Sequence, residues 1–317
     1  MRVVFIPHGS NDAMRALLAP IWLLFVLALA ACSSPESVES SVAAAGSAAG
    51  DEPRTEVAAS GAEESTVGVA AHAGRAESAS GDPFVSRAEA SGGTNHDADA
   101  VLAVRYGVHE GYERVVLDLG TGEEPAETVP EWTLTSSANE GLLRMTLPSM
   151  SRTAVSDGPL GDGLLESFYV VRAPEGGMFV DVFARKAFAY RVLELSDPAR
   201  LVVDFRPTGS PLDTPLPAVG GQTVVVEPRA GARVGDPLTV CGYSRNFEAT
   251  NNIILANHKG KTVVRRTVLS NDWTATWGYF ETTLDLPSFT GKGILRVGAE
   301  SARDGTFEGV EVPVTSR

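Results

Sequence analysis

The stretch Arg114-Val-Val-Leu-Asp-Leu119 alternates with a period of two. Side chains of a strand point to opposite faces in turn, so Val115 shares one face with the leucines, and the Arg and Asp share the other. The later stretch Arg200-Leu-Val-Val-Asp-Phe205 matches it position by position in residue class. An Arg and an Asp four apart on one strand lie about 13 Å apart, at about 3.3 Å per residue, so they cannot pair with each other. Two interpretations stay open: solvated surface charges, or pairs formed across the two copies in an antiparallel sheet.

The region around these copies contains further short segments of strand character, and Gly or Pro signals separate most of them. No segment shows a helical period over three turns. Residues 100–208 are therefore predicted to form an all-β unit. The other strand candidates are 131–136, 142–147, 168–172, 178–183 and 190–195.

A Pro-rich stretch, residues 209–221, reads as a semi-rigid linker. Strands return after it at a regular spacing that is typical of a seven-strand sandwich, in residues 222–317. The fold class expected is thus all-β, with two β-sandwich domains in tandem. The seven candidates are 223–227, 238–243, 252–256, 262–269, 278–286, 294–300 and 308–314.

The N-terminal region differs from the rest in composition. Leu29-Ala-Ala-Cys32 closes an uncharged apolar run and resembles the lipobox of bacterial lipoprotein signal peptides. The run suits a signal peptide, residues 1–31, better than the alternative of an uncleaved membrane helix, which needs about 20 apolar residues. The resemblance implies that Cys32 carries a lipid. Residues 32–99 are rich in Ala, Ser, Gly and Glu, so we expect a long disordered acidic tether.

The charge and the cysteine content bear on the partners and on the disulfides that we expect for this protein. The formal net charge is -14, and no segment is basic enough to neutralise a row of phosphates, so we expect no nucleic-acid partner. With Cys32 lipidated, Cys241 has no disulfide partner in the chain. Cys241 alternates with Leu238 and Val240, which predicts a small packing residue on the strand face away from the core.

The sequence offers little for catalysis. The five histidines and two cysteines have no metal-ligand spacing, and no nucleophile elbow or phosphate-binding Gly loop is present. We therefore expect no enzyme activity, no catalytic residue, no metal and no cofactor. Asp157, Asp162 and Glu166 flank glycines, but they lack the alternating ligands of a calcium loop and are expected to form a solvated acidic loop. Carboxylates for glycoside cleavage need not be close in sequence, so a cell-wall hydrolase remains an alternative.

Aromatic residues are dense in the second unit, and they are the candidates for binding. Exposed rings would suit stacking on sugars or a protein contact. For Trp277 and Phe247 the other interpretation is packing in the core or in loops. The candidate binding residues are Phe247, Glu248, Trp273, Trp277 and Tyr279.

Two resemblances add to this picture. Tyr112-Glu-Arg-Val-Val-Leu-Asp-Leu119 and Leu195-Ser-Asp-Pro-Ala-Arg-Leu-Val-Val-Asp-Phe205 resemble the two signatures of AMIN and AMIN-like domains, although residues 133–172 depart from the usual spacing. Those domains are symmetric β-sandwiches of envelope proteins that are thought to hold partner modules at the cell wall. The resemblance implies an AMIN-like β-sandwich over residues 100–208.

The second unit is similar to the immunoglobulin-like domain of bacterial sporulation and spore-germination proteins. The similarity rests on Pro237-Leu-Thr-Val240 with Gly242, Phe247-Glu-Ala249, Trp277-Gly278, Ser301-Ala-Arg-Asp-Gly305 and Val310-Glu-Val-Pro-Val314. A sandwich of this kind serves many roles, so the fold alone gives no function.

These observations lead to one expectation and two rivals. We expect a non-catalytic, extracytoplasmic protein, held by its N-terminal lipid to a bacterial membrane, that binds peptidoglycan or an envelope protein and is linked to sporulation or germination. The rivals are a wall-modifying hydrolase and a scaffold subunit of an envelope complex. The oligomeric state is left open.

Overall fold

The computed structural model describes residues 83–94, 97–301 and 303–316. The expected signal peptide, Cys32 and most of the expected tether lie outside these residues. All of the described strands belong to one compact unit, residues 74–317. In the described part of the chain, strands are joined by loops and two short 3-10 helices, and no helix is long and apolar enough to cross a membrane. The expected all-β fold with two sandwiches in tandem is confirmed.

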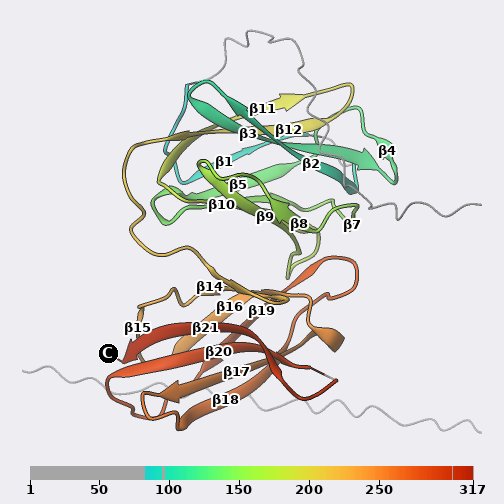
Figure 1. Ribbon diagram of the computed structural model, residues 1–317. Helices are drawn as coiled ribbons and strands as arrows, with labels where there is room; N and C mark the ends of the chain where they lie inside the picture. The colour runs from blue at the N-terminus through green and yellow to red at the C-terminus, as the bar shows by residue number, and fades with distance from the viewer. Residues whose placement is uncertain (1–82, 95–96, 302, 317) are drawn as a thin grey trace, which may run out of the picture. The chain divides into compact units, whose positions relative to one another are not determined.

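The first sandwich has two layers, which Figure 1 shows as separate sheets. One sheet has the order β11-β12-β3-β2-β7, and the first five strands of the other have the order β1-β5-β6-β10-β9. The first sheet contains β2 (Ala100–His109), β3 (Tyr112–Thr121), β7 (Arg152–Thr153), β11 (Phe188–Leu195) and β12 (Arg200–Pro207), with β4 (Glu124–Pro125) beside β3. The second contains β1 (Glu89–Gly92), β5 (Trp132–Ser137), β6 (Leu142–Leu147), β9 (Leu165–Arg172) and β10 (Met178–Ala184), with β8 (Asp157–Pro159) beside β9.

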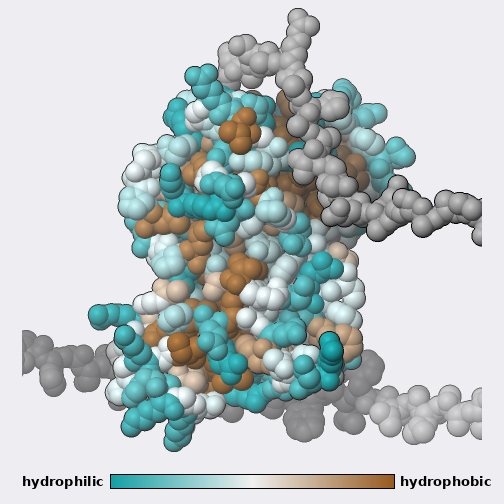
Figure 2. Space-filling model, in the orientation of Figure 1, coloured by the Kyte–Doolittle hydropathy of each residue, from teal (hydrophilic) through white to brown (hydrophobic). Residues whose placement is uncertain are grey.

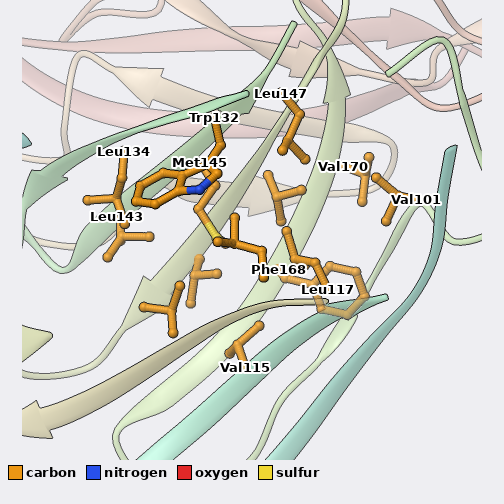
Figure 3. Packing of buried hydrophobic residues seen from close by; sticks show 14 of the residues in the cluster. Val101, Val115, Leu117, Trp132, Leu134, Leu143, Met145, Leu147, Phe168 and Val170 are labelled. Atoms are coloured by element: carbon orange, nitrogen blue, oxygen red, sulfur yellow. The ribbon is translucent and has the colours of Figure 1, made fainter. Parts of the chain in front are cut away.

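The core of this sandwich lies between the two sheets, as the alternation predicts. Val115, Leu117 and Leu119 of β3 are all buried. Figure 3 shows Val115 and Leu117 of β3 packed in the core with Phe168, Met145 and Leu143, which come from the opposite sheet. Burying an apolar side chain of this size stabilises the fold by about 1.5–3 kcal/mol, so these alternating positions determine which face of each strand turns inward.

The two copies of the repeated stretch pair with each other. Strands β3 and β12 are antiparallel neighbours, and the register sets Asp204 opposite Arg114. Arg114 Nε lies 2.6 Å from the carboxylate of Asp204, whose side chain is fully buried. The second possible pair does not form, because Asp118 binds Arg105 instead of Arg200. Of the two interpretations, pairing across the strands is therefore correct for Arg114 and Asp204, which are not solvated separately.

The expected domain boundaries are wrong at two places. The tether was expected to reach residue 99, but Glu89–Gly92 form β1, which pairs with β5. The linker was expected to reach residue 221, but Ala218–Gly220 form β13, which pairs with β14 (Thr223–Glu227). Both are edge strands made largely of small residues. They are held by backbone hydrogen bonds to a neighbouring strand, and such strands leave little hydrophobic pattern in the sequence.

The second sandwich contains the seven strands that the spacing predicts, together with the short strands β13 and β15, which it did not predict. One layer is β13-β14-β16-β19 and the other is β15-β21-β20-β17-β18. Val310, Val312 and Val314 of β21 are buried, as their alternation requires. The remaining strands are β15 (Arg233–Val234), β16 (Leu238–Ser244), β17 (Thr250–Asn257), β18 (Thr262–Leu269), β19 (Trp277–Leu284), β20 (Lys292–Glu300) and β21 (Phe307–Ser316).

Candidate functional site

The two sandwiches meet along one strand pair. Strand β19 lies parallel to β9, with Trp277 opposite Val171 and Gly278 opposite Arg172. The β1-β5-β6-β10-β9 layer of the first sandwich and the β13-β14-β16-β19 layer of the second are therefore parts of one continuous ten-stranded sheet. Thr276, which is buried, donates a hydrogen bond of 2.5 Å from its hydroxyl to the backbone oxygen of Val170. The Pro-rich stretch between the sandwiches is therefore not the only connection between them.

A separate apolar cluster fills this contact. The ring of Tyr169 lies 5.1 Å from Trp277 in an edge-to-face arrangement and 5.3 Å from Tyr243. Phe179 and Phe183 complete the aromatic part of the cluster from β10. Aromatic pairs of this geometry contribute about 0.5–1.5 kcal/mol each beyond the area that they bury. The contact is thus packed like a domain core.

Two of the predicted binding residues belong to this contact. Trp277 is only 4% exposed, so the packing interpretation is correct for it and the binding prediction is wrong. Tyr279 lies at the rim, where its ring is 6.3 Å from Phe179. Partial burial and the hydrogen bond to Glu281 raise the pKa of Tyr279, which therefore stays protonated. The sequence could not distinguish these rings from exposed ones, because the covering surface comes from another domain.

Cys241 has the packing role that the alternation predicts. Val240 points into the core of the second sandwich, and Cys241 packs against the cluster on the other face of β16. Burial raises the pKa of the Cys241 thiol, and the nearby Glu281 and Glu227 raise it further. A thiol with a raised pKa is a poor nucleophile at neutral pH.

Phe247, which is exposed, and Trp273, which is half-buried, form an aromatic pair at the surface. Phe247 is 63% exposed, and its ring lies 5.2 Å from that of Trp273 in an edge-to-face arrangement. Phe247 lies on a 3-10 turn (Phe247–Ala249) between β16 and β17, while Trp273 lies on the loop before β19. Figure 2 shows hydrophobic residues dispersed among hydrophilic ones on one face of the molecule, which is the ordinary case. Two large rings in contact at an exposed site differ from that background.

The backbone next to Phe247 is held in an unfavourable conformation. Glu248 and Ala249 have φ values of 54° and 57°, in the left-handed region that residues with a side chain avoid. Asn251 stabilises the turn by donating a hydrogen bond of 3.0 Å to the backbone oxygen of Ala249. Such strain persists only where the surrounding structure enforces it, and it gathers at functional sites. Glu248, the remaining predicted binding residue, is exposed beside Phe247.

Asp272 fixes the loop that carries Trp273. Its Oδ1 accepts hydrogen bonds from the backbone N–H groups of Trp273, Thr274 and Ala275, at 2.7, 3.0 and 3.1 Å. Its other oxygen lies 3.3 Å from Arg172 of the first sandwich. Burial opposes ionisation, but these donors outweigh it, so the pKa of Asp272 is lowered. An Asp at the start of a loop, whose side chain can accept from backbone N–H groups two residues on, is the signal that could have identified this anchor in the sequence.

Two other candidate sites in the described part of the chain, the loop of Asp157 and a hollow along residues 207–215, do not bring catalytic carboxylates together. Asp157 was expected in a solvated acidic loop, but its carboxylate accepts a 2.9 Å hydrogen bond from the indole of Trp277. A hollow of about 1000 Å³ runs along residues 207–215 beside Arg185 and Lys186. Its lining contains one acid, Asp213, so this hollow lacks the two carboxylates used in glycoside hydrolysis. Arg185 is already bound to two backbone oxygens there.

Comparison with known proteins bears on the sandwich that carries the aromatic pair. Residues 222–306 match Gmad2, the immunoglobulin-like domain of bacterial spore germination. The match confirms the resemblance expected for the second sandwich and contains both Phe247 and Trp273. No curated protein and no solved structure matches the chain.

Proposed function

We propose that this chain is a non-catalytic envelope protein that is anchored by a lipid on Cys32 and binds peptidoglycan through the Phe247–Trp273 pair. The match of residues 222–306 to the immunoglobulin-like domain of bacterial spore germination supports a role in spore germination. The AMIN-like resemblance of the first sandwich and the lipobox resemblance at residues 29–32 support a place at the cell wall.

The observation that carries the binding proposal is the aromatic pair formed by the exposed Phe247 and the half-buried Trp273. Sugar rings present C–H groups that pack on aromatic faces, and two rings at an angle form a corner that a sugar can enter. Glu248, beside Phe247, supplies an acceptor for sugar hydroxyls. The loops are held before any ligand arrives, by the strained turn and by Asp272, so binding would cost little ordering entropy.

Binding to purified sacculi tests this proposal. We expect the full chain with Cys32→Ser to sediment with sacculi, and the same chain with Phe247→Ser and Trp273→Ala to lose most of that binding. Val219→Ser is the matched control, because Val219 is an exposed apolar residue (48%) of the same sandwich away from the pair. Equal sedimentation of the double variant and the control would overturn the aromatic site.

The anchor and the absence of catalysis have tests of their own. We expect Cys32→Ser to move the protein from the membrane fraction to a soluble fraction of cells, whereas retention at the membrane would contradict the anchor. Incubation of the chain with sacculi is expected to release no soluble fragments. Fragment release that continues after repurification would instead favour the wall-hydrolase alternative.

A further inference from the structure

The β17–β18 hairpin of the second sandwich is basic, although the protein is acidic. Residues 250–269 contain four basic side chains and no acidic one, whereas the whole chain has a formal net charge of -14. Lys259 and Lys261 lie in the turn, Arg265 and Arg266 lie in β18, and all four are exposed. A surface of one sign attracts groups of the opposite sign, so this hairpin points to an anionic partner.

Strand β18 is also the open edge of its sheet. The sheet ends in the order β20-β17-β18, and among the described strands β18 pairs only with β17. Figure 1 shows β18 as the last strand of this sheet. The outer edge of Thr262–Leu269 therefore presents backbone N–H and C=O groups that no described strand binds. An extended segment can add to such an edge as a further strand.

The rest of the sandwich holds the cations of this edge only weakly. Arg265 pairs with Glu300 at 3.0 Å, but both side chains are more than half exposed. Arg266 donates a hydrogen bond of 2.9 Å to the backbone oxygen of Thr283 in β19, which is a neutral acceptor. The two turn lysines form no ion pair with a described acid. Exposed ion pairs contribute little, so a carboxylate brought to this edge can compete for its cations.

The charge of the edge argues against a second copy of β18 as the added strand. Antiparallel pairing of two β18 strands about their midpoint would set Arg265 of each copy opposite Arg266 of the other. Like charges directly opposite one another destabilise a strand pair. Edge arginines thus protect the sheet against self-association, and they leave an acidic segment as the suitable occupant.

We propose that the acidic segment, residues 51–69 of the same chain, docks on the edge of β18. This segment contains five acids and one base, a net charge of -4 that is equal and opposite to that of the hairpin. Its adjacent Glu63 and Glu64 match the adjacent Arg265 and Arg266 in spacing. Neighbouring residues of a strand point to opposite faces, so one carboxylate meets one guanidinium on each face.

The acidic segment has the composition and the length to reach this edge. Its last five residues, Ser65-Thr-Val-Gly-Val69, place two β-branched valines at alternate positions, as in a strand. An extended chain spans about 3.3–3.6 Å per residue, so the 14 steps from Val69 to Pro83 cover about 46–50 Å and the 32 steps from Asp51 about 105–115 Å. A compact unit of this size has a radius of gyration of about 18 Å, so the segment can reach its surface.

Docking would shorten the reach of the sandwiches from the membrane. The chain from Cys32 to Asp51 spans at most about 63–68 Å, against about 170–180 Å from Cys32 to Pro83. Salt screens contacts between exposed charges, so we expect high ionic strength to release the segment and lengthen the tether. Only this consequence rests on the proposed lipid at Cys32; docking itself requires neither the lipid nor wall binding.

Hydrogen exchange of the full chain with Cys32→Ser, followed by mass spectrometry, tests the proposal without any ligand. A neutral-segment variant alters no residue of the two sandwiches, and it combines Asp51→Asn, Glu52→Gln, Glu56→Gln, Glu63→Gln and Glu64→Gln. We expect amides of β18 to exchange about tenfold faster in this variant at low salt, because covalent linkage gives the segment an effective concentration in the millimolar range. At about 0.5 M salt both chains should exchange alike.

A matched control removes acids from the same N-terminal region outside the acidic segment. Glu36→Gln, Glu39→Gln and Glu77→Gln together should leave the exchange of β18 unchanged. Equal exchange of β18 in the parent chain and the neutral-segment variant at low salt would overturn the proposal. Protection that rises with protein concentration would overturn it as well, because the occupant would then come from another copy.

Charge reversal gives a second test that a loss of folding cannot imitate. Arg265→Glu with Arg266→Glu should remove the protection of β18, and adding Glu63→Arg with Glu64→Arg to the same chain should restore most of it. The slow exchange of the neighbouring strands β17 and β20 shows that each variant is folded. Failure of the second pair to restore protection in a folded chain would overturn docking, whatever sacculus binding by the aromatic pair shows.

Discussion

The indole nitrogen of Trp277 donates a hydrogen bond to the carboxylate of Asp157, 2.9 Å away, from one sandwich to the other. The donor belongs to the first residue of β19 and the acceptor to the first residue of β8. The ring of Trp277 is buried in the cluster that both sandwiches share. A single side chain thus contributes both apolar packing and a polar bond to the contact. Each sandwich consequently depends on the other for part of its buried surface.

Trp277→Ala is expected to destabilise the whole unit. Removing a buried Trp costs about 3–5 kcal/mol, from lost burial and the cavity that is left. Trp277→Phe should cost less, about 1 kcal/mol for the lost hydrogen bond. Urea unfolding followed by circular dichroism measures both values. Because the cluster is shared, we expect one cooperative transition for the wild type.

Trp273→Ala is the control variant, and its loss of stability is compared with that of Trp277→Ala. Trp273 is half-buried and contacts an exposed ring, so its loss should cost clearly less than that of Trp277. Two separate transitions in the wild type, with Trp277→Ala shifting only one, would contradict the shared contact.

The buried and exposed ion pairs of the first sandwich should differ in their effect on stability. Asp181 has a fully buried side chain, so Asp181→Ala leaves the Arg144 guanidinium without its partner and is expected to cost about 3–5 kcal/mol. Asp118 pairs with Arg105, whose side chain is 54% exposed, and Asp118→Ala should cost at most about 1 kcal/mol. Chemical denaturation of the two variants gives the comparison. Similar losses in both would mean that burial does not set the strength of these pairs.

Local pattern was enough to predict most of the strands and their inward faces, although β2 (Ala100–His109) was not among the candidates. The alternation in β3 correctly places Val115, Leu117 and Leu119 in the core, and the copy in β12 lies beside it in the register that the charges suggested. These features depend on side chains whose burial is large and whose period is two. Segments without such side chains, such as β1 and β13, were assigned to the tether and linker instead.

The candidate site was harder to predict, because contacts between domains leave no period in the sequence. Trp277 and Phe247 look alike as aromatic residues near turns, yet one is buried by the first sandwich and the other is exposed.

Gly278 is expected to tolerate no side chain. A Cβ at this position would collide with backbone atoms of Asp272, including its carbonyl oxygen, and backbone cannot move aside as a flexible side chain can. Gly278→Ala should therefore displace the loop that carries Trp273 and destabilise the protein by about 1–3 kcal/mol, the cost of overpacking. Thermal unfolding measures the loss. Gly260→Ala is the control for a glycine with no close neighbour, although its positive φ of 76° adds a backbone cost.

The anchoring of the aromatic loop by Asp272 predicts a pH dependence. The pKa of Asp272 is lowered in the folded state, despite burial, by the backbone donors of residues 273–275 and by Arg172. A lowered folded pKa means that the carboxylate stabilises the fold fully above its unfolded pKa, about 3.9, and that this contribution is lost as the pH falls through the folded value. At pH 7, Asp272→Asn should therefore be less stable than the wild type, by about 1 kcal/mol.

The difference between the two proteins should shrink as the pH is lowered from about 5 toward 2, because the wild-type carboxylate becomes protonated and then resembles the amide. Urea titrations at several pH values measure it, with Asp236→Asn as a control, since Asp236 accepts one backbone hydrogen bond, from Leu286, in a different loop. A gap between wild type and Asp272→Asn that is constant over this range would show that Asp272 acts through its shape and not through its charge. In that case the loop would hold Trp273 equally well at acid pH, and sacculus binding through the aromatic pair should be insensitive to the same pH change.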